Sequence, residues 1–442
     1  MVDEPVVVGG PDLCPYLLIE RLSSEGGVLD TADLRPSTFT SDDVRNAMLP
    51  LITNLSVRVL HLPIDRTDLI CSKTIAMMIK NNVGPPIEEL HLSHFPTEED
   101  VEPELCSKLS SLIISSLVHS KNIKKLHITT ELVLHQSIQA SIASILYDNN
   151  SISSLILRGC GISHAGGTKI SCALANNSSI KVLDLSNNQL GSKGICSVAL
   201  ALEMNHTIQK LKLSGTSMGR EGGEAMVEAL AVNKSLEVLD MSRNALDDVV
   251  VTKLARMLKQ NTSLRQMSLR SNSFSTIGAL CLSLAMYDPN NLHTVLGCNH
   301  TIQYLDILSN KVSRECIMHT NKSLRWNALS TTKNETIRKK VSSFLLESEP
   351  NCEYMTDHFG DAATLLKLMP NILWSMNNST ALFYVVKNLT VHSLMADSSP
   401  ETLSVIKSSS DSIFSTDNTR NDGAKDDNRG AIPEFINVNQ NG

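Results

Sequence analysis

The chain of 442 residues is longer than one compact core usually supports, and its net charge is −7. Aromatic residues make up only 4% of the sequence against 42% apolar residues in total, so leucine, isoleucine and valine must supply the core. The mild negative charge argues against a protein that coats nucleic acid. This composition favours small units stacked in layers, because each unit of a repeat array packs only on its neighbours.

The leader, residues 1–29, lacks the features of a secretory signal. Acidic residues stand where a signal needs a basic segment, and the apolar runs are short and broken. No stretch reaches the roughly eighteen apolar residues that cross a membrane. The ten cysteines are scattered without a C-x-x-C pair, which is typical of reduced thiols and not of a disulfide framework or a zinc site. We therefore expect an intracellular, cytoplasmic protein.

One pattern recurs along the middle of the chain. Residues 177–190 (NSSIKVLDLSNNQL) and 233–246 (NKSLEVLDMSRNAL) agree at eight of fourteen positions and begin 56 residues apart. Their alignment gives the template L-x-x-L-x-L-x-x-N, and four consecutive spacings of its central position equal 28 residues. The central position falls at Leu60, Leu90, Leu126, Leu155, Leu183, Leu211, Leu239, Met267 and Leu305.

Each unit predicts a short strand followed by a helix. The L-x-L alternation indicates a strand with one buried face, and spacings such as Ile170, Ala173 and Leu174 indicate a helix. The asparagine five residues after the central leucine predicts a buried side chain that bonds the turn, and later glycines suit a turn into the helix. These asparagines are Asn188, Asn244, Asn272 and Asn310, with Cys160 in the same slot; the glycines are Gly166, Gly194, Gly222 and Gly278.

The units resemble leucine-rich repeats of the ribonuclease-inhibitor type over residues 30–330, as about ten units. The resemblance implies an α/β solenoid shaped like a horseshoe, with parallel strands on the concave face and helices on the convex face. A weaker unit is expected at Asp33–Leu34, and a decayed one at 321–329. Such a scaffold hosts many binding tasks, so the resemblance specifies the fold more sharply than the function.

The register breaks at two insertions and ends near residue 330. The segments 97–104 and 288–297 are predicted as loops on one rim, and a binding role and neutral drift are equally compatible with them. Residues 331–397 are predicted to form a helical cap, with amphipathic helices over 334–347 and 361–376. The polar residues 398–442 are predicted to be disordered.

Seven N-x-[ST] sequons stand six residues before central leucines. Because their spacing follows the repeat, we interpret them as structural: asparagine tolerates the left-handed conformation that ends a helix, and Ser or Thr bonds the turn. Glycosylation is the alternative that a secreted protein would favour. The asparagines are Asn54, Asn149, Asn177, Asn205, Asn233, Asn261 and Asn299.

Three histidines, His61, His91 and His127, directly follow the central leucine on successive predicted strands. Strands lie ~4.8 Å apart, so the rings are expected to form a column on the concave face. A column of this kind suits metal binding or a pH switch, and simple stacking of a solvent-facing residue type is the alternative. We predict no metal, because the three rings lack a carboxylate companion and lie too nearly in line for tetrahedral ligation.

Basic residues collect along the predicted concave face between Leu155 and Leu269. A concave wall concentrates its field, so an acidic partner is expected to bind there, with His91 and His127 extending the surface. A solvated face of mixed charge is the alternative. Against the acidic Asp184, Glu237 and Asp240 stand Arg158, Lys181, Lys210, Lys212, Arg243, Arg265 and Arg270.

The sequence carries none of the common catalytic or nucleotide-binding signatures, GxSxG, HExxH, GxxxxGK[ST] or CxxC. We therefore predict a non-catalytic interaction scaffold without a cofactor, which binds a protein partner with an acidic surface. A second hypothesis is a regulator of a small GTPase, because Ran GTPase-activating proteins have a similar repeat, although the tail here has no long acidic run. An immune-type sensor is disfavoured without a preceding nucleotide-binding domain, and a nucleic-acid binder without aromatic residues for stacking.

Overall fold

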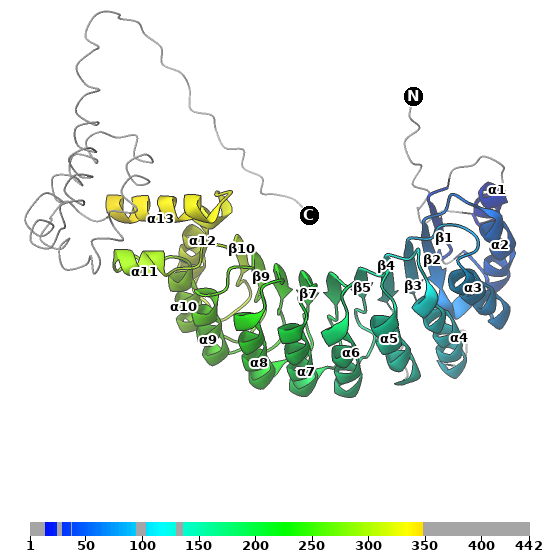
Figure 1. The fold of residues 1–442 in the computed structure, drawn as a ribbon, viewed down its shortest axis with the longest axis horizontal. Coiled ribbons are helices and arrows are strands. Elements are labelled where there is room, and N and C mark those ends of the chain that lie inside the picture. Colours follow the sequence, from blue (N-terminus) through cyan, green and yellow to red (C-terminus); the bar gives the residue numbers. More distant parts are fainter. Residues whose placement is uncertain (1–13, 24–28, 37, 94–102, 130–135, 348–442) are drawn as a thin grey trace, which may run out of the picture.

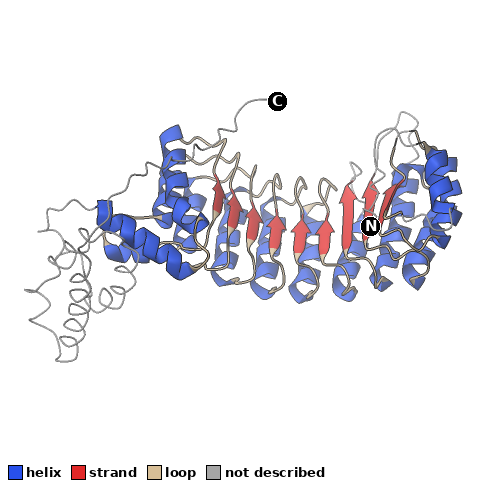
Figure 2. Cartoon of the chain, turned by 90° about the horizontal axis from the view of Figure 1, so that it is seen from above, coloured by secondary structure: helices blue, strands red, loops and turns tan. Residues whose placement is uncertain are grey.

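The computed structural model describes residues 14–23, 29–36, 38–93, 103–129 and 136–347. Ten parallel strands form one open sheet in which the spatial order equals the sequence order. The strands line the inner side of a shallow arc and the helices cover its outer side (Figure 1). Seen from above, the strands stand in a row with helices beneath them and at both ends (Figure 2). This arrangement is the predicted α/β solenoid.

The strands pair so that equivalent repeat positions lie side by side. Leu155 pairs with Leu183, and Leu183 pairs with Leu211. A slip of one residue would turn every buried side chain toward solvent, so the leucine pattern itself fixes this register. The strands are β1 (Thr31–Asp33), β2 (Val59–Pro63), β3 (Glu89–Ser93), β4 (Lys125–Thr129), β5 (Ser154–Ile156), β6 (Val182–Asp184), β7 (Lys210–Lys212), β8 (Val238–Asp240), β9 (Gln266–Ser268) and β10 (Tyr304–Asp306).

A helix follows each strand and returns the chain to the start of the next one. Each packs against the helices of neighbouring units, so the outer layer is as continuous as the sheet. The helices are α1 (Pro15–Ser23), α2 (Ser41–Thr53), α3 (Leu69–Asn81), α4 (Pro103–Ser116), α5 (Gln136–Asp148), α6 (His164–Asn176), α7 (Gly191–Met204), α8 (Gly219–Val232), α9 (Asp248–Leu258), α10 (Thr276–Met286), α11 (Leu292–Leu296), α12 (Arg314–Ala328) and α13 (Lys333–Glu347), with 3-10 turns η1 (Ile64–Arg66) and η2 (Leu117–His119).

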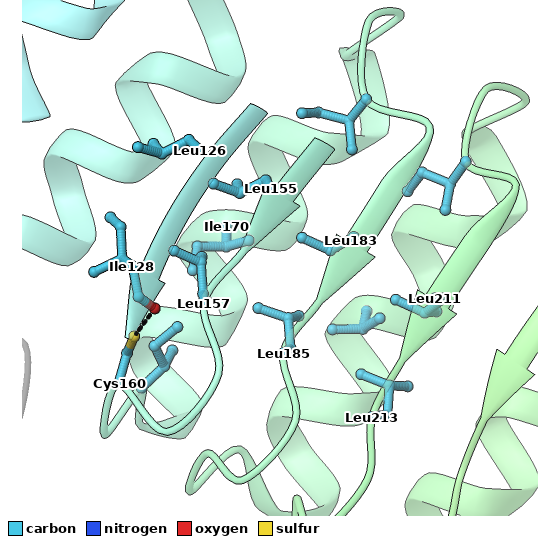
Figure 3. Close-up of a cluster of buried hydrophobic side chains, with 14 of the residues drawn as sticks. Leu126, Ile128, Leu155, Leu157, Cys160, Ile170, Leu183, Leu185, Leu211 and Leu213 are labelled. Carbon is cyan, nitrogen blue, oxygen red and sulfur yellow. Dashed lines mark hydrogen bonds between the residues drawn. The ribbon is translucent and has the colours of Figure 1, made fainter. Parts of the chain in front are cut away.

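The core runs as two rows of aliphatic side chains along the sheet. Leu155 and Leu183 belong to the row of central leucines, Leu157 and Leu185 to the row two residues later, and helix residues such as Ile170 close the other side (Figure 3). All of these are at most 1% exposed. Burial of each such side chain contributes ~1.5–3 kcal/mol, so the array is held by many similar contributions and not by one centre.

The predicted asparagine slot is buried at Asn188, Asn244 and Asn272 and partly buried at Asn310, and all four side chains are hydrogen-bonded. Asn188 donates its amide to the carbonyl oxygens of Leu157 at 2.7 Å and Leu185 at 2.8 Å, and it accepts from the main-chain NH of Ile162. Cys160 fills the same slot, and its thiol lies 3.1 Å from the carbonyl oxygen of Ile128 (Figure 3). Each side chain thereby links its own coil to the preceding one.

The sequon asparagines form a second buried ladder at the opposite ends of the strands. Asn233 is fully buried, donates to the carbonyl oxygens of Leu202 and Asn205, and accepts from the main-chain NH groups of Ser235 and Leu236. These contacts confirm the structural interpretation of the sequons. The expected left-handed conformation is wrong, because Asn233 has φ −68° and ψ 133°, which is extended. An extended residue turns the chain directly into the next strand.

The predicted turn glycines lie elsewhere than expected. Gly222 belongs to α8 and contacts Ile195 of α7, where a Cβ atom would come within 3.1 Å of that side chain. These glycines therefore allow close helix packing and do not form the turns. The left-handed turn position comes three residues after the strand, and Gly159 and Gly215 occupy it with φ of 69° and 66°.

The N-terminal end of the array is closed by α1, which lies inside the predicted leader. Its Leu18 and Leu22 are buried, and the helix packs against α2. The weak unit expected at Asp33–Leu34 is present as β1, which pairs with β2. The acidic insertion at 97–104 lies mainly outside the described residues.

The C-terminal end differs from the expectation in two respects. Residues 321–329 fall almost entirely in α12, so they form no further strand. The insertion 288–297 is not an open loop, because it contains α11, which buries Leu292 and Val295 and packs against α13. Lys340 of α13 donates to the carbonyl oxygens of Met286 and Asn299, which flank that insertion.

The helix predicted over 334–347 is present as α13. The remainder of the predicted cap to residue 397, including the 361–376 helix, and the predicted tail 398–442 lie outside the described residues. Their boundaries stay predictions. Within the ranges that the structure describes, no helix combines the length and apolar character that a membrane crossing requires.

Candidate functional site on the concave face

The seven predicted basic residues are all exposed, but they differ in their position relative to the strands: some lie before a strand, some within one and some in the turn after one. Lys210 and Lys212 project from β7 itself. Lys181 and Arg265 each stand one residue before a strand, and Arg158, Arg243 and Arg270 follow strands within the turns. The seven side chains therefore do not form one column, although the in-register sheet fixes the position of each.

Acidic residues flank the centre of this surface. The ladder places Lys212 between Asp184 of β6 and Asp240 of β8, and Lys212 lies 3.8 Å from the Asp184 carboxylate. The aspartates also accept main-chain NH groups at the strand ends, from Ser186 and Ser242. These hydrogen bonds partly offset the negative charge of the two aspartates. The strand residues of this surface therefore carry mixed charge.

The positive charge is densest over β7 to β9, where five basic residues oppose Glu237 and Asp240. We call the five the β7–β9 basic patch: Lys210, Lys212, Arg243, Arg265 and Arg270. Arg243 has φ 56° at a turn position that is left-handed in other coils too, where it is filled by Gly159, Asn187, Gly215, Ser271 and Ser309. A long side chain in that conformation costs ~1 kcal/mol relative to glycine.

The three histidines form the predicted column. The ring centroids of His61 and His91 lie 4.0 Å apart in a stacked arrangement, and those of His91 and His127 lie 4.2 Å apart and are tilted. The parallel ladder pairs His61 with His91 and His91 with His127, and Asp33 of β1 continues the column beside His61. The N-terminal part of the concave face is therefore an imidazole surface.

The prediction that these histidines lack a carboxylate companion is wrong. Glu89 lies two residues before His91 on the same face of β3, and its Oε1 atom is 2.8 Å from His91 Nε2 and 3.9 Å from His127 Nε2. Its Oε2 atom accepts from Lys125 at 2.9 Å. The sequence contained this signal, because residues two apart on a strand share a face.

Burial governs the protonation of this cluster. It lowers the pKa of His61 to about 4, with a further contribution from His91, and it also lowers the pKa of His91 and His127. Burial opposes ionisation of Glu89 as well, but hydrogen bonds from Lys125 and His91 outweigh it and lower the pKa of that carboxyl. The site thus holds neutral imidazoles beside an ionised carboxylate at neutral pH.

Comparison with known families identifies the repeat. A family model for "Leucine Rich repeat" matches residues 176–199, 205–227 and 232–255. The repeats are leucine-rich repeats. The matched segments span β6 to β8, and the unbroken sheet register extends the same leucine-rich repeat architecture from β1 to β10. A search of the curated proteins finds no match.

Solved structures of low sequence identity are similar to this chain. The leucine-rich repeat-containing protein LegL7 from Legionella pneumophila is 15% identical, with a TM-score of 0.39, and the match covers 68% of this chain and 98% of that one. The Rad7 and Elc1 complex in yeast is 14% identical, with a TM-score of 0.39, and the match covers 70% of this chain and 76% of that one. Leiomodin-1 Actin-Binding Site 2 is 16% identical, with a TM-score of 0.28, and the match covers 47% of this chain and 93% of that one. At these identities and TM-scores the likenesses carry no functional argument.

Proposed function

We propose that this chain is a non-catalytic protein-interaction scaffold, of the ribonuclease-inhibitor-like type, whose concave face binds a protein partner with an acidic surface. One observation carries the proposal: the exposed lysines and arginines of the β7–β9 basic patch project from consecutive strands and turns of one rigid sheet. Arg158 and Lys181 extend the positive surface toward β5, and the uncharged imidazoles of His91 and His127 add polar contacts further along the sheet.

A rigid array favours binding because its side chains are already positioned. The backbone loses little conformational freedom when a partner docks, so more of the contact energy appears as affinity. The mixed charge around Lys212 adds specificity, since a partner must place basic or neutral groups opposite Asp184 and Asp240.

Charge reversal on the two faces of the solenoid tests the proposal. The concave variant combines Lys210→Glu, Lys212→Glu and Arg243→Glu. The control combines three exposed basic residues of the helices, Lys169→Glu, Lys193→Glu and Arg256→Glu, which change the net charge equally. Each full-length protein is used as bait in native lysate, with quantitative mass spectrometry of the captured proteins and circular dichroism to verify folding.

A partner retained by wild type and by the helix control, but lost by the concave variant, supports the proposal. The captured partner should have an acidic surface and should dissociate as salt increases. A partner retained equally by all three baits contradicts it and would favour a binding surface elsewhere, such as α11 and α13.

The second candidate is a regulator of a small GTPase resembling Ran GTPase-activating proteins, supported by the 28-residue repeat. Single-turnover GTP hydrolysis by Ran, with and without this chain, tests it directly. Stimulation lost in the concave variant and kept in the helix control would assign that activity to the β7–β9 basic patch. Unchanged hydrolysis at saturating protein would exclude it.

A further inference from the structure

The concave face of β3 and β4 brings together three side chains with the donor atoms of a metal site. Glu89 and His91 share a face of β3, and His127 stands opposite His91 on β4. One donor atom from each of the three lies within 4.8 Å of the other two. Because the carboxylate shares a strand with one imidazole while the second imidazole comes from the next strand, the donors form a triangle and not a line.

The separations are close to those that a tetrahedral cation imposes. Bonds of ~2.0–2.1 Å at the tetrahedral angle place two donor atoms ~3.3–3.4 Å apart. Glu89 Oε1 lies 2.8 Å from His91 Nε2 and 3.9 Å from His127 Nε2, so both separations must change by about half an ångström. The donor atoms of His91 and His127 lie within 4.8 Å of each other, so rotation of all three side chains is needed to bring the donors to one spacing.

We propose that Glu89, His91 and His127 bind a divalent transition-metal cation of the Zn²⁺ type, with one coordination position open toward the concave side. Two imidazoles and one carboxylate are a ligand set that zinc accepts, whereas Ca²⁺ and Mg²⁺ prefer oxygen donors alone. The three side chains are 18–22% exposed, so the open position receives water or a donor atom from a bound molecule. This inference does not depend on the proposed protein partner.

The surrounding charges set the strength of the site. Arg35 is neutralised by two contacts with the Asp33 carboxylate, at 2.7 and 2.8 Å. Lys125 holds the outer oxygen of Glu89, which leaves Oε1 for the cation, but its charge opposes a second cation nearby. A bound metal would replace the proton shared between His91 and Glu89.

Zinc titration of the full-length chain against a chromophoric chelator tests the site. Wild type should bind one Zn²⁺ that His91→Ala, His127→Ala and Glu89→Gln each weaken by about 100-fold or more, since even the partners of ligands commonly contribute 10–100-fold. Lys125→Met should tighten binding by up to about tenfold. Cobalt bound at the same site should give visible ligand-field bands without the near-ultraviolet band of thiolate ligands.

The control is His206→Ala, which removes an exposed histidine outside the triangle and should leave the affinity unchanged. Circular dichroism of the metal-free proteins verifies folding, and the isosteric Glu89→Gln carries the test if a histidine variant fails to fold. Equal zinc affinity of wild type and the three ligand variants, a thiolate spectrum with cobalt, or unchanged or weaker binding by Lys125→Met would overturn the assignment.

Discussion

The side-chain amide of Asn233 donates to the main-chain carbonyl oxygen of Asn205, the residue that holds the same position one coil earlier. Asn205 in turn donates to the carbonyl oxygen of Asn177. The ladder thus runs through side chain and backbone alternately, and it ties each helix end to the coil before it. A contact of this kind satisfies buried carbonyls that neither the helix nor the sheet reaches.

We expect Asn233→Ala to lower the free energy of unfolding by about 3 kcal/mol or more, because several buried groups lose their partner and each costs ~1–3 kcal/mol. Urea unfolding followed by circular dichroism measures the change. The adjacent exposed Lys234→Ala is the control and should shift stability by less than about 0.5 kcal/mol. Similar losses in the two variants would show that the ladder contributes little.

Cys160 occupies the slot that asparagine fills in other coils. An amide there would donate to the carbonyl oxygen of Ile128, as Asn188 does to Leu157. We expect Cys160→Asn to raise stability by about 0.5–1 kcal/mol, because an amide is a stronger donor than a thiol. Cys160→Ala should lower it by a similar amount. Thermal unfolding under reducing conditions compares the two, and a less stable asparagine variant would contradict the equivalence of the slots.

Arg243 is held in left-handed backbone on the proposed binding surface. We expect Arg243→Gly to raise the free energy of unfolding by about 0.5–1 kcal/mol, since glycine adopts this conformation without the Cβ penalty. The same change should weaken capture of the acidic partner. Arg270→Gly is the comparison, because its backbone is not left-handed and the substitution should not stabilise. A destabilised Arg243→Gly protein would refute the strain argument.

The C-terminal end of the described array should be less stable at acidic pH than at alkaline pH. Burial lowers the pKa of Lys340 to about 7 and that of His300 to about 4. For each group the unfolded chain binds more protons between the folded and unfolded pKa, so stability rises with pH in that window. The windows run from about 4 to 6.5 for His300 and from about 7 to 10.5 for Lys340.

The fluorescence of Trp326, which packs near Tyr287, measures this local stability in a Trp374→Phe background. His300→Gln should flatten the pH dependence of the unfolding midpoint below pH 6.5, and Lys340→Met should flatten it above pH 7. The exposed His206→Gln should change neither window. A midpoint that falls from pH 7 to 9 in wild type would contradict the assigned directions.

The leucine template predicted the register of the sheet because each strand repeats the same burial requirement. It even located β1, where Ala32 replaces the central leucine and Leu34 is still buried. Residues 321–329 begin like a repeat, with an N-x-S-L sequence, but they lack the L-x-L pair that forms a strand. They therefore lie almost entirely in α12. The helix within 288–297 was missed because its two buried side chains depend on α13, which is distant in sequence.

The candidate sites were predictable only in part. Column positions such as His91 and Lys212 follow from the repeat, because equivalent residues must lie side by side. Glu89 stands before the central Leu90, so the repeated histidine position after the central leucine gives no sign of this carboxylate. The charges flanking Lys212 became clear only when the register placed Asp184 and Asp240 on either side.

Gly222 and Gly223 of α8 bear on how sharply the solenoid bends. A Cβ atom on Gly222 would crowd Ile195 of α7, and one on Gly223 would come within 2.8 Å of Val250 of α9. Strands are spaced at ~4.8 Å and helices ordinarily at 8–10 Å, and this mismatch closes the horseshoe. Glycine at these positions permits a closer approach of the helices than a larger side chain would, which favours gentler curvature at the β7–β9 basic patch. A gently curved face suits the broad surface of a folded domain better than a narrow peptide.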